Sequence, residues 1–179
     1  MFLKIQRLFL IVLLFEASCA APPAIAPEPS EVLHQNQDQL TQIIIYDVFT
    51  PPVASRIYVY ASLASYEAMR HAEKGYPSLT EKLNGFDAMP QPDAALSYDY
   101  SLAATKAFFR VVRNVKVFSV DSLVKYENAL FDQYRSVLSK EVYERSVQFG
   151  DTVGATILKR AKADGYALSR GKEKHLGST

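Results

Sequence analysis

Apolar residues recur at steps of three and four along most of this chain, and that spacing is typical of helices rather than strands. After Ser30, for example, the apolar positions include Leu33, Leu40, Ile44 and Val48. No stretch alternates polar and apolar residues with period two over more than a few positions. The chain is therefore predicted to be all-α, a bundle of about five helices.

Prolines, glycines and capping residues divide the predicted helices. Thr50, Pro51 and Pro52 end the first helix and open the second, because proline fits the first turn of a helix but not its interior. Ser30, Ser119 and Ser139 are suited to cap helices that begin there. The second helix has small or apolar residues on both sides, which is typical of a central position in a bundle. The predicted ranges are 30–48, 51–73, 93–115, 119–137 and 139–165.

Two glycines, Gly150 and Gly154, share a face of the fifth predicted helix. Each costs about 1 kcal/mol in helix propensity relative to alanine. The pair is therefore predicted to let a neighbouring backbone approach closely.

The N-terminus has the features of an export signal. Lys4 and Arg7 precede an apolar run at 8–15, which is too short to span a membrane, and small residues follow at 17–20. The predicted organisation is a lipoprotein-like signal peptide at 1–20, a Pro/Ala tether at 21–30, a helical domain at 31–166 and a frayed polar tail at 167–179.

Cys19 is the single cysteine, and two processing routes remain open for it. Its place after small residues suits lipid attachment, although Glu16 departs from the usual signature; the alternative is cleavage after Ala20, which discards the thiol. The expected location is accordingly the periplasm or, as a lipoprotein, the outer membrane, with secretion as the alternative. Contact with a membrane is expected only through such an N-terminal lipid.

The processed chain is expected to be electrically neutral. Removing Lys4, Arg7 and Glu16 from 20 basic and 19 acidic residues leaves 18 of each. Binding to nucleic acid depends largely on neutralising phosphates with basic side chains. No nucleic-acid partner is therefore expected.

A longer motif lies across the predicted junction of the first two helices. Residues 47–68 read DVFTPPVASRIYVYASLASYEA, and the shorter runs LNG at 83–85 and VYERS at 142–146 support it. Together they resemble the N-terminal helical half of the bacterial vanadium-dependent haloperoxidase and type 2 phosphatidic acid phosphatase superfamily. The resemblance extends over about 33–166. It implies that the predicted bundle is an incomplete half of a larger helical fold.

The resemblance also implies a specific oxyanion site. In this superfamily vanadate or phosphate is held by a Lys with a downstream Arg-Pro, by a Ser-Gly-His stretch, and by an Arg followed by a histidine. The chain contains neither Arg-Pro nor Ser-Gly-His. No catalytic, cofactor-binding or metal-binding residue is therefore assigned. The vanadate or phosphate site is expected in a catalytic half that this chain lacks. The chain is then expected to be a truncated product or the first piece of a split gene. The expected partner is such a half or a second copy of the chain.

The three histidines are candidate site residues. The run from Ser169 and Arg170 to His175 resembles the third superfamily element, but its spacing is one residue short and no acid follows. His34 and His71 lack a second ligand at metal-binding spacing, and a helix-surface pair of His71 with Glu67 is the simpler expectation.

Charged residues on the predicted helices offer two further candidates. Arg56 and Glu67 lie on one face of a helix that otherwise has a buried pattern, so each is expected to be paired, in a structural ion pair rather than a cavity-lining one. The basic edge, which we define as Lys106, Arg110 and Arg113, is interpreted as a solvated helix face, with anion binding as the alternative.

The sequence thus favours an exported haloperoxidase- or acid phosphatase-like scaffold that lacks its oxyanion-binding half and is inactive alone. The first alternative is a free-standing envelope lipoprotein that acts as a helical interaction module. The second is a small metal- or anion-dependent enzyme that uses His34 or His71.

Overall fold

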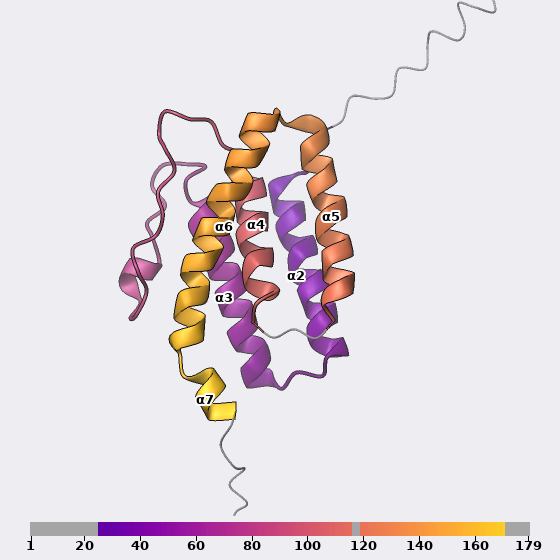
Figure 1. The fold of residues 1–179 in the computed structure, drawn as a ribbon, viewed down its shortest axis with the longest axis vertical. Helices are drawn as coiled ribbons and strands as arrows, with labels where there is room; N and C mark the ends of the chain where they lie inside the picture. The colour runs from indigo at the N-terminus through magenta and orange to yellow at the C-terminus, as the bar shows by residue number, and fades with distance from the viewer. Residues whose placement is uncertain (1–24, 116–118, 171–179) are drawn as a thin grey trace, which may run out of the picture.

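The computed structural model describes residues 25–115 and 119–170, and in these residues it contains helices and no strand (Figure 1). The predicted all-α bundle of about five helices is confirmed. Its elements are α2 (Pro29–Tyr46), α3 (Pro51–Met69), the short 3₁₀ helix η2 (Thr80–Lys82), α4 (Tyr100–Val112), α5 (Val120–Val137), α6 (Lys140–Ala163) and α7 (Tyr166–Arg170).

Helix α4 lies at the centre of the bundle, and α2, α3, α5 and α6 all pack against it (Figure 1). Its apolar residues face several neighbours, and Leu102, Phe108 and Phe109 are completely buried. The sequence favoured the second predicted helix for this central position. That helix, α3, does bury Ala61, Ala64 and other small residues, but its main partners are α4 and α6.

Several helix boundaries differ from the predicted ones because other side chains cap them. Helix α2 begins at Pro29, and Glu28 rather than Ser30 caps it by accepting a hydrogen bond from the Glu31 amide. Helix α4 begins at Tyr100 instead of near residue 93, because Asp99 accepts from the Leu102 amide at 2.8 Å. Helix α3 ends at Met69 rather than at residue 73.

The buried face of α2 is rotated from the predicted one. It consists of Val32, Asn36, Leu40, Ile43 and Ile44. Two residues of the predicted stripe, Leu33 and Val48, are exposed instead.

The predicted close approach at Gly150 and Gly154 is present where α6 crosses α4. A Cβ atom added at Gly150 would lie 2.2 Å from the carbonyl oxygen of Ala103. One added at Gly154 would lie 2.9 Å from the carbonyl oxygen of Ala107. Both distances are shorter than van der Waals contact, so the packing of these two helices requires glycine at both positions.

The segment between α3 and α4 lies along the outside of the bundle beside α6 (Figure 1). Lys159 of α6 contacts Asp87 at 2.6 Å, and Arg160 donates to the carbonyl oxygen of Asn84 at 3.2 Å. These contacts hold the segment against α6.

Helix α6 stops where the sequence predicts, since Gly165 follows its end with φ +82°. Leu168, expected in the polar tail, lies in α7. The predicted signal peptide, Cys19 and His175 lie outside the described residues. No helix in the described ranges is long and apolar enough to span a membrane.

Candidate functional site

Arg56 and Glu67 do not pair with each other, because eleven residues along an α-helix place them about 16 Å apart. Arg56 instead pairs with Asp164 just after α6, with 2.6 Å between Nε and Oδ2. It also donates to the Ala161 carbonyl oxygen and lies 4.4 Å from the ring centre of Tyr166. Arg56 therefore joins the start of α3 to the end of α6.

The charge on Asp164 is stabilised by these contacts. Partial burial alone would raise the pKa of its carboxyl group, but the hydrogen bond from Arg56, the Tyr166 amide and the Arg56 charge outweigh it and lower the pKa. Tyr60 donates a further hydrogen bond to Asp164 at 3.2 Å. The Asp164 carboxylate, with all of these hydrogen bonds, therefore serves as a structural link between α3 and the end of α6.

Glu67 is completely buried and anchors the segment after α3. Its carboxylate pairs with Arg70 at 3.0 Å and accepts hydrogen bonds from the Leu79 amide at 2.8 Å, the Thr80 amide at 3.2 Å and the Ser78 hydroxyl at 3.1 Å. These four donors tie the segment after α3 to the Glu67 side chain, so its role is structural.

His71 does not pair with Glu67, which is directed to Arg70. Its ring instead lies between the rings of Tyr100 and Phe149, at centroid distances of 6.1 and 5.6 Å. Burial, together with the nearby Arg70 charge, lowers the pKa of His71. The imidazole is therefore neutral and packed among aromatic rings at neutral pH. His34 is exposed on α2.

The basic edge is paired with carboxylates from two other helices. Lys106 lies 3.4 Å from Asp151 of α6 and 4.0 Å from Glu127 of α5, and Arg113 lies 3.2 Å from Glu127. Arg110 lies 3.7 Å from Asp151. The interpretation of this edge as a solvated face holds only in part: all three cations are paired in an interhelical network, and Lys106 is largely buried, but the Arg110 side chain is still 41% exposed.

This network does not fit a vanadate or phosphate group. A multiply charged oxyanion needs several cationic or amide donors that are free to converge on it. Here the clustered cations already face Glu127 and Asp151, whose negative charges would repel the anion. In the described part of the chain, no group of three or more His, Cys, Asp or Glu residues is placed to hold a metal ion either.

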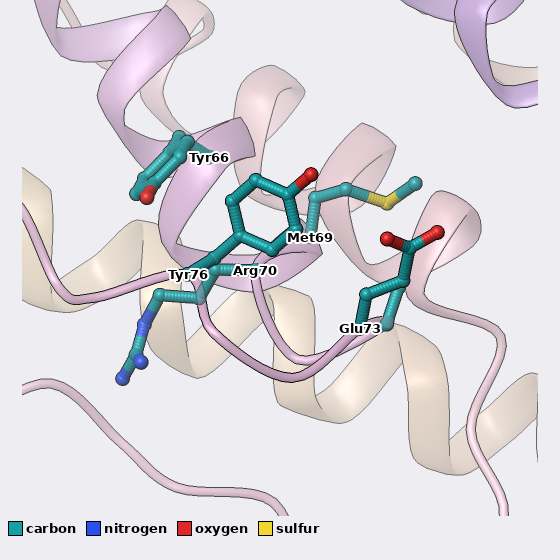
Figure 2. Close-up of a pocket in the computed structure, with 6 residues that line it drawn as sticks. Tyr66, Met69, Arg70, Glu73 and Tyr76 are labelled. Atoms are coloured by element: carbon teal, nitrogen blue, oxygen red, sulfur yellow. The ribbon is translucent and has the colours of Figure 1, made fainter.

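A hollow with a volume of about 630 Å³ lies between α2, α3 and α4, and we call it the groove. Val32 and Asn36 of α2 line it, opposite Ser65 and Met69 of α3 and Thr105 of α4. A smaller hollow of about 250 Å³ adjoins it and shares Tyr66, Met69 and Glu73. In Figure 2 the Tyr76 ring lies across this smaller hollow, with Met69 and the Glu73 carboxylate on one side and the Arg70 guanidinium directed away.

Asn36 was not predicted from the sequence to be a lining residue, although a signal was present. Asn36 lies four residues from both Val32 and Leu40, so it occupies an apolar position in the helical repeat. It was overlooked because the apolar stripe was placed one residue away, through Leu33.

Comparison with known proteins places this chain beside a solved enzyme structure. No family model and no curated protein matches the chain. A solved structure of a bacterial vanadium-dependent iodoperoxidase matches with a TM-score of 0.77 and 32% sequence identity, over 83% of this chain and 35% of that one. The chain therefore spans about a third of the length of the protein it matches. The resemblance to the haloperoxidase superfamily is confirmed.

Proposed function

We propose that this chain, a relative of the vanadium-dependent haloperoxidases, is the helical scaffold of an exported haloperoxidase- or acid phosphatase-like protein and holds no oxyanion by itself. The similarity to an iodoperoxidase over 83% of the chain supports the lineage. The groups that would hold vanadate or phosphate belong, in this proposal, to a catalytic partner polypeptide or segment.

The observation that carries the proposal is the pairing of the basic edge. Lys106, Arg110 and Arg113 would be the natural donors for an oxyanion, yet each faces Glu127 or Asp151. The missing Arg-Pro and Ser-Gly-His motifs support the same conclusion. Binding an anion there would require breaking partly buried ion pairs, which is strongly unfavourable.

A partner surface is available where α2 turns into α3. Ile45, Tyr46 and Val48, which we call the apolar corner, are 64%, 79% and 83% exposed. Large apolar side chains gathered on a surface commonly mark an interaction site. The small-residue stripe of α3, in contrast, is already covered, since Ala61 and Ala64 are completely buried within this chain.

The apolar corner equally supports the alternative function, a free-standing envelope lipoprotein that acts as a helical interaction module. The two functions predict different results when this chain is substituted for part of the iodoperoxidase. If it is a scaffold, a chimera in which it substitutes for the matching third of the iodoperoxidase should fold, bind vanadate and oxidise iodide. An interaction module with no place in that enzyme should give a chimera that binds no vanadate, although the iodoperoxidase itself does.

The proposal predicts that the purified chain is inactive. Supplied with vanadate, peroxide and iodide or bromide, or with a phosphate monoester, it should show no turnover above buffer, and its addition should not broaden the vanadium NMR signal of vanadate. The bacterial iodoperoxidase serves as the positive control for the halide assay. Turnover that is abolished by His175→Ala would contradict the proposal, because it would place the oxyanion site within this chain.

A further inference from the structure

The turn that follows α3, residues 70–77, is anchored by the two side chains at its beginning. The side chains from 72 to 77 are exposed, whereas those of Arg70 and His71 are partly buried. Arg70 pairs with Glu67 at 3.0 Å, and the His71 ring packs among aromatic rings of other elements. The turn therefore depends on His71 for its contact with the rest of the bundle.

His71 belongs to an aromatic cluster, which we define as His71, Tyr98, Tyr100 and Phe149. The His71 ring meets the Phe149 ring of α6 at a centroid distance of 5.6 Å and the Tyr100 ring, at the start of α4, at 6.1 Å. Tyr98 stacks on Tyr100 at 5.7 Å. These separations are usual for interacting aromatic side chains. The cluster thus joins the turn to two helices.

The position of His71 in this cluster suits the neutral imidazole and not the charged one. Its Nε2 atom is buried and has no hydrogen-bond partner among the described residues. A protonated imidazole carries N–H groups on both nitrogens, so the one at Nε2 would have no acceptor. A positive charge there would also lose part of its hydration. Protonation is therefore opposed by the packing itself.

The charged groups nearest to the ring do not compensate for this loss. Arg70 adds a second positive charge beside His71 and, together with burial, lowers the pKa of the imidazole. Glu67 acts in the opposite direction, but its carboxylate is already occupied by Arg70, by two backbone amides and by the Ser78 hydroxyl. The balance at this end of α3 favours the neutral ring.

The elements packed against the turn supply no carboxylate to the ring in the contacts of the described residues. From α4 and α6 the ring meets Tyr100 and Phe149. Burial raises the pKa of Tyr100, so its phenol stays uncharged at neutral and acidic pH. The charged group of α6 next to the cluster is another cation, Arg145, which lies 5.6 Å from the centre of the Tyr98 ring.

We propose that His71 is a pH switch for this turn: the neutral ring holds the turn against α4 and α6, and protonation in acidic solution releases the turn and opens the smaller hollow that it lines. Arg70, Ala72, Glu73 and Tyr76 of the turn all line that hollow (Figure 2). The switch does not depend on the proposed scaffold function.

The direction of the pH effect follows from which state takes up the proton. A released turn binds a proton at the ordinary imidazole pKa of about 6.5, whereas the packed turn binds it only at lower pH. The packed form therefore has its full stability above that value and loses stability as the pH falls below it.

The release is expected to stay local, because the start of α4 is tied to α6 by other contacts. The Asp99 amide donates to the Ser146 hydroxyl at 2.8 Å, and Arg145 donates to the Ser97 carbonyl oxygen at 2.6 Å. Neither contact requires a change in protonation when the solution is made mildly acidic. The bundle should remain folded while the turn opens.

The test measures how fast a glutamate-specific protease cuts the full chain after Glu73, an exposed residue of the turn. Rates at about pH 7 and about pH 5, on either side of the ordinary imidazole pKa, are each divided by the rate for a short reference peptide. The acid-to-neutral ratio for the unaltered chain should exceed that for His71→Phe roughly three- to tenfold, because phenylalanine keeps a ring but takes up no proton. His34→Phe, at an exposed histidine of α2, should respond as the unaltered chain does.

NMR of the unaltered chain gives a second measurement that needs no folded variant. Ring-to-ring NOE contacts between His71 and Phe149 should be present at neutral pH and should disappear as the imidazole takes up its proton. The midpoint of that titration should lie below the ordinary value of about 6.5.

Three results would overturn the proposal. The first is the same acid-to-neutral ratio in His71→Phe as in the unaltered chain. The second is persistence of the His71–Phe149 contacts after protonation, which would show that the aromatic rings accept the cation. The third is equal acceleration of cleavage at glutamates outside the turn, which would indicate unfolding of the whole chain. If His71→Phe does not fold, the NMR titration decides the matter.

Discussion

Val48 has a backbone conformation that its residue type disfavours. Val48 follows the end of α2, and among the described residues it is the non-glycine residue with a positive φ, at +53°. Its amide donates to the Ile45 carbonyl oxygen and the Phe49 amide donates to the Ile44 carbonyl oxygen, both at 3.1 Å. This is the hydrogen-bond pattern of a Schellman motif, in which glycine is the usual residue at the position that Val48 occupies.

Replacing Val48 with glycine should therefore stabilise the fold. A left-handed conformation costs an L-residue roughly 1–2 kcal/mol, part of which is offset by the greater freedom of glycine in the unfolded chain. We expect Val48→Gly to raise the free energy of unfolding by up to about 1 kcal/mol in urea titrations. Val59→Gly, at a similarly exposed valine inside α3, should lower it, because glycine is unfavourable in a helix interior. A loss of stability in both variants would show that Val48 is not strained.

At the scale of elements, the contact between α4 and α6 is set by two missing side chains. Gly150 and Gly154 bring α6 against the backbone of α4 at Ala103 and Ala107. Most helix pairs are separated by their side chains at 8–10 Å between axes. The two glycines four residues apart were enough to predict that another helix packs closely against α6. They did not predict which helix this is, because any helix with small residues on one face could pack there.

Gly150→Ala should destabilise the protein although alanine favours helices. The added Cβ would lie 2.2 Å from the Ala103 carbonyl oxygen, and neither backbone can yield without moving a helix. Overpacking of this kind typically costs 1–3 kcal/mol, which exceeds the gain of about 1 kcal/mol in helix propensity. Thr152→Ala, on the exposed side of α6, should change the unfolding free energy by less than about 0.5 kcal/mol. Equal stability of Gly150→Ala and the unaltered chain in thermal melts would mean that the two helices can separate freely.

At the scale of the whole molecule, α5 is joined to the bundle partly through a buried acid. Glu127 projects from α5 toward Lys106 of α4 and Arg113, which directly follows α4, and is 2% exposed. Burial raises the pKa of Glu127 and Asp151 adds to the effect, although Arg113 and Lys106 act in the opposite direction. The folded protein therefore holds this proton more tightly than the unfolded chain does.

This predicts a stability that falls as the pH rises. When folding raises the pKa of an acid, ionising that acid lowers the free energy of unfolding. This loss of stability is absent below the ordinary carboxyl pKa and grows as the pH rises through the pKa of the folded state. Glu127→Gln should remove that penalty, so its unfolding free energy relative to the unaltered chain should increase from acidic to neutral pH. Glu144→Gln, at an exposed carboxylate of α6, should show a nearly flat difference. A relative stability of Glu127→Gln that decreases over the same range would show that the two cations outweigh burial.

Local patterns in the sequence were enough to predict the helices, the break at Pro51 and Pro52 and the stop at Gly165. They were not enough to predict partners, because these come from distant parts of the chain. Arg56 pairs with Asp164, and Glu67 with residues beyond the end of its own helix. The unpaired side-chain oxygen of Asn36 is likewise a feature that no periodicity within one helix predicts.

The central place of α4 affects how this polypeptide is made. One side of α4, at Ala103 and Ala107, is covered by α6, which is translated after α5. Until α6 has left the ribosome, a nascent chain holds an uncovered apolar helix, and such surfaces are the usual targets of chaperones. Synthesis of the last third of the sequence is thus the step at which the growing chain ceases to need that protection.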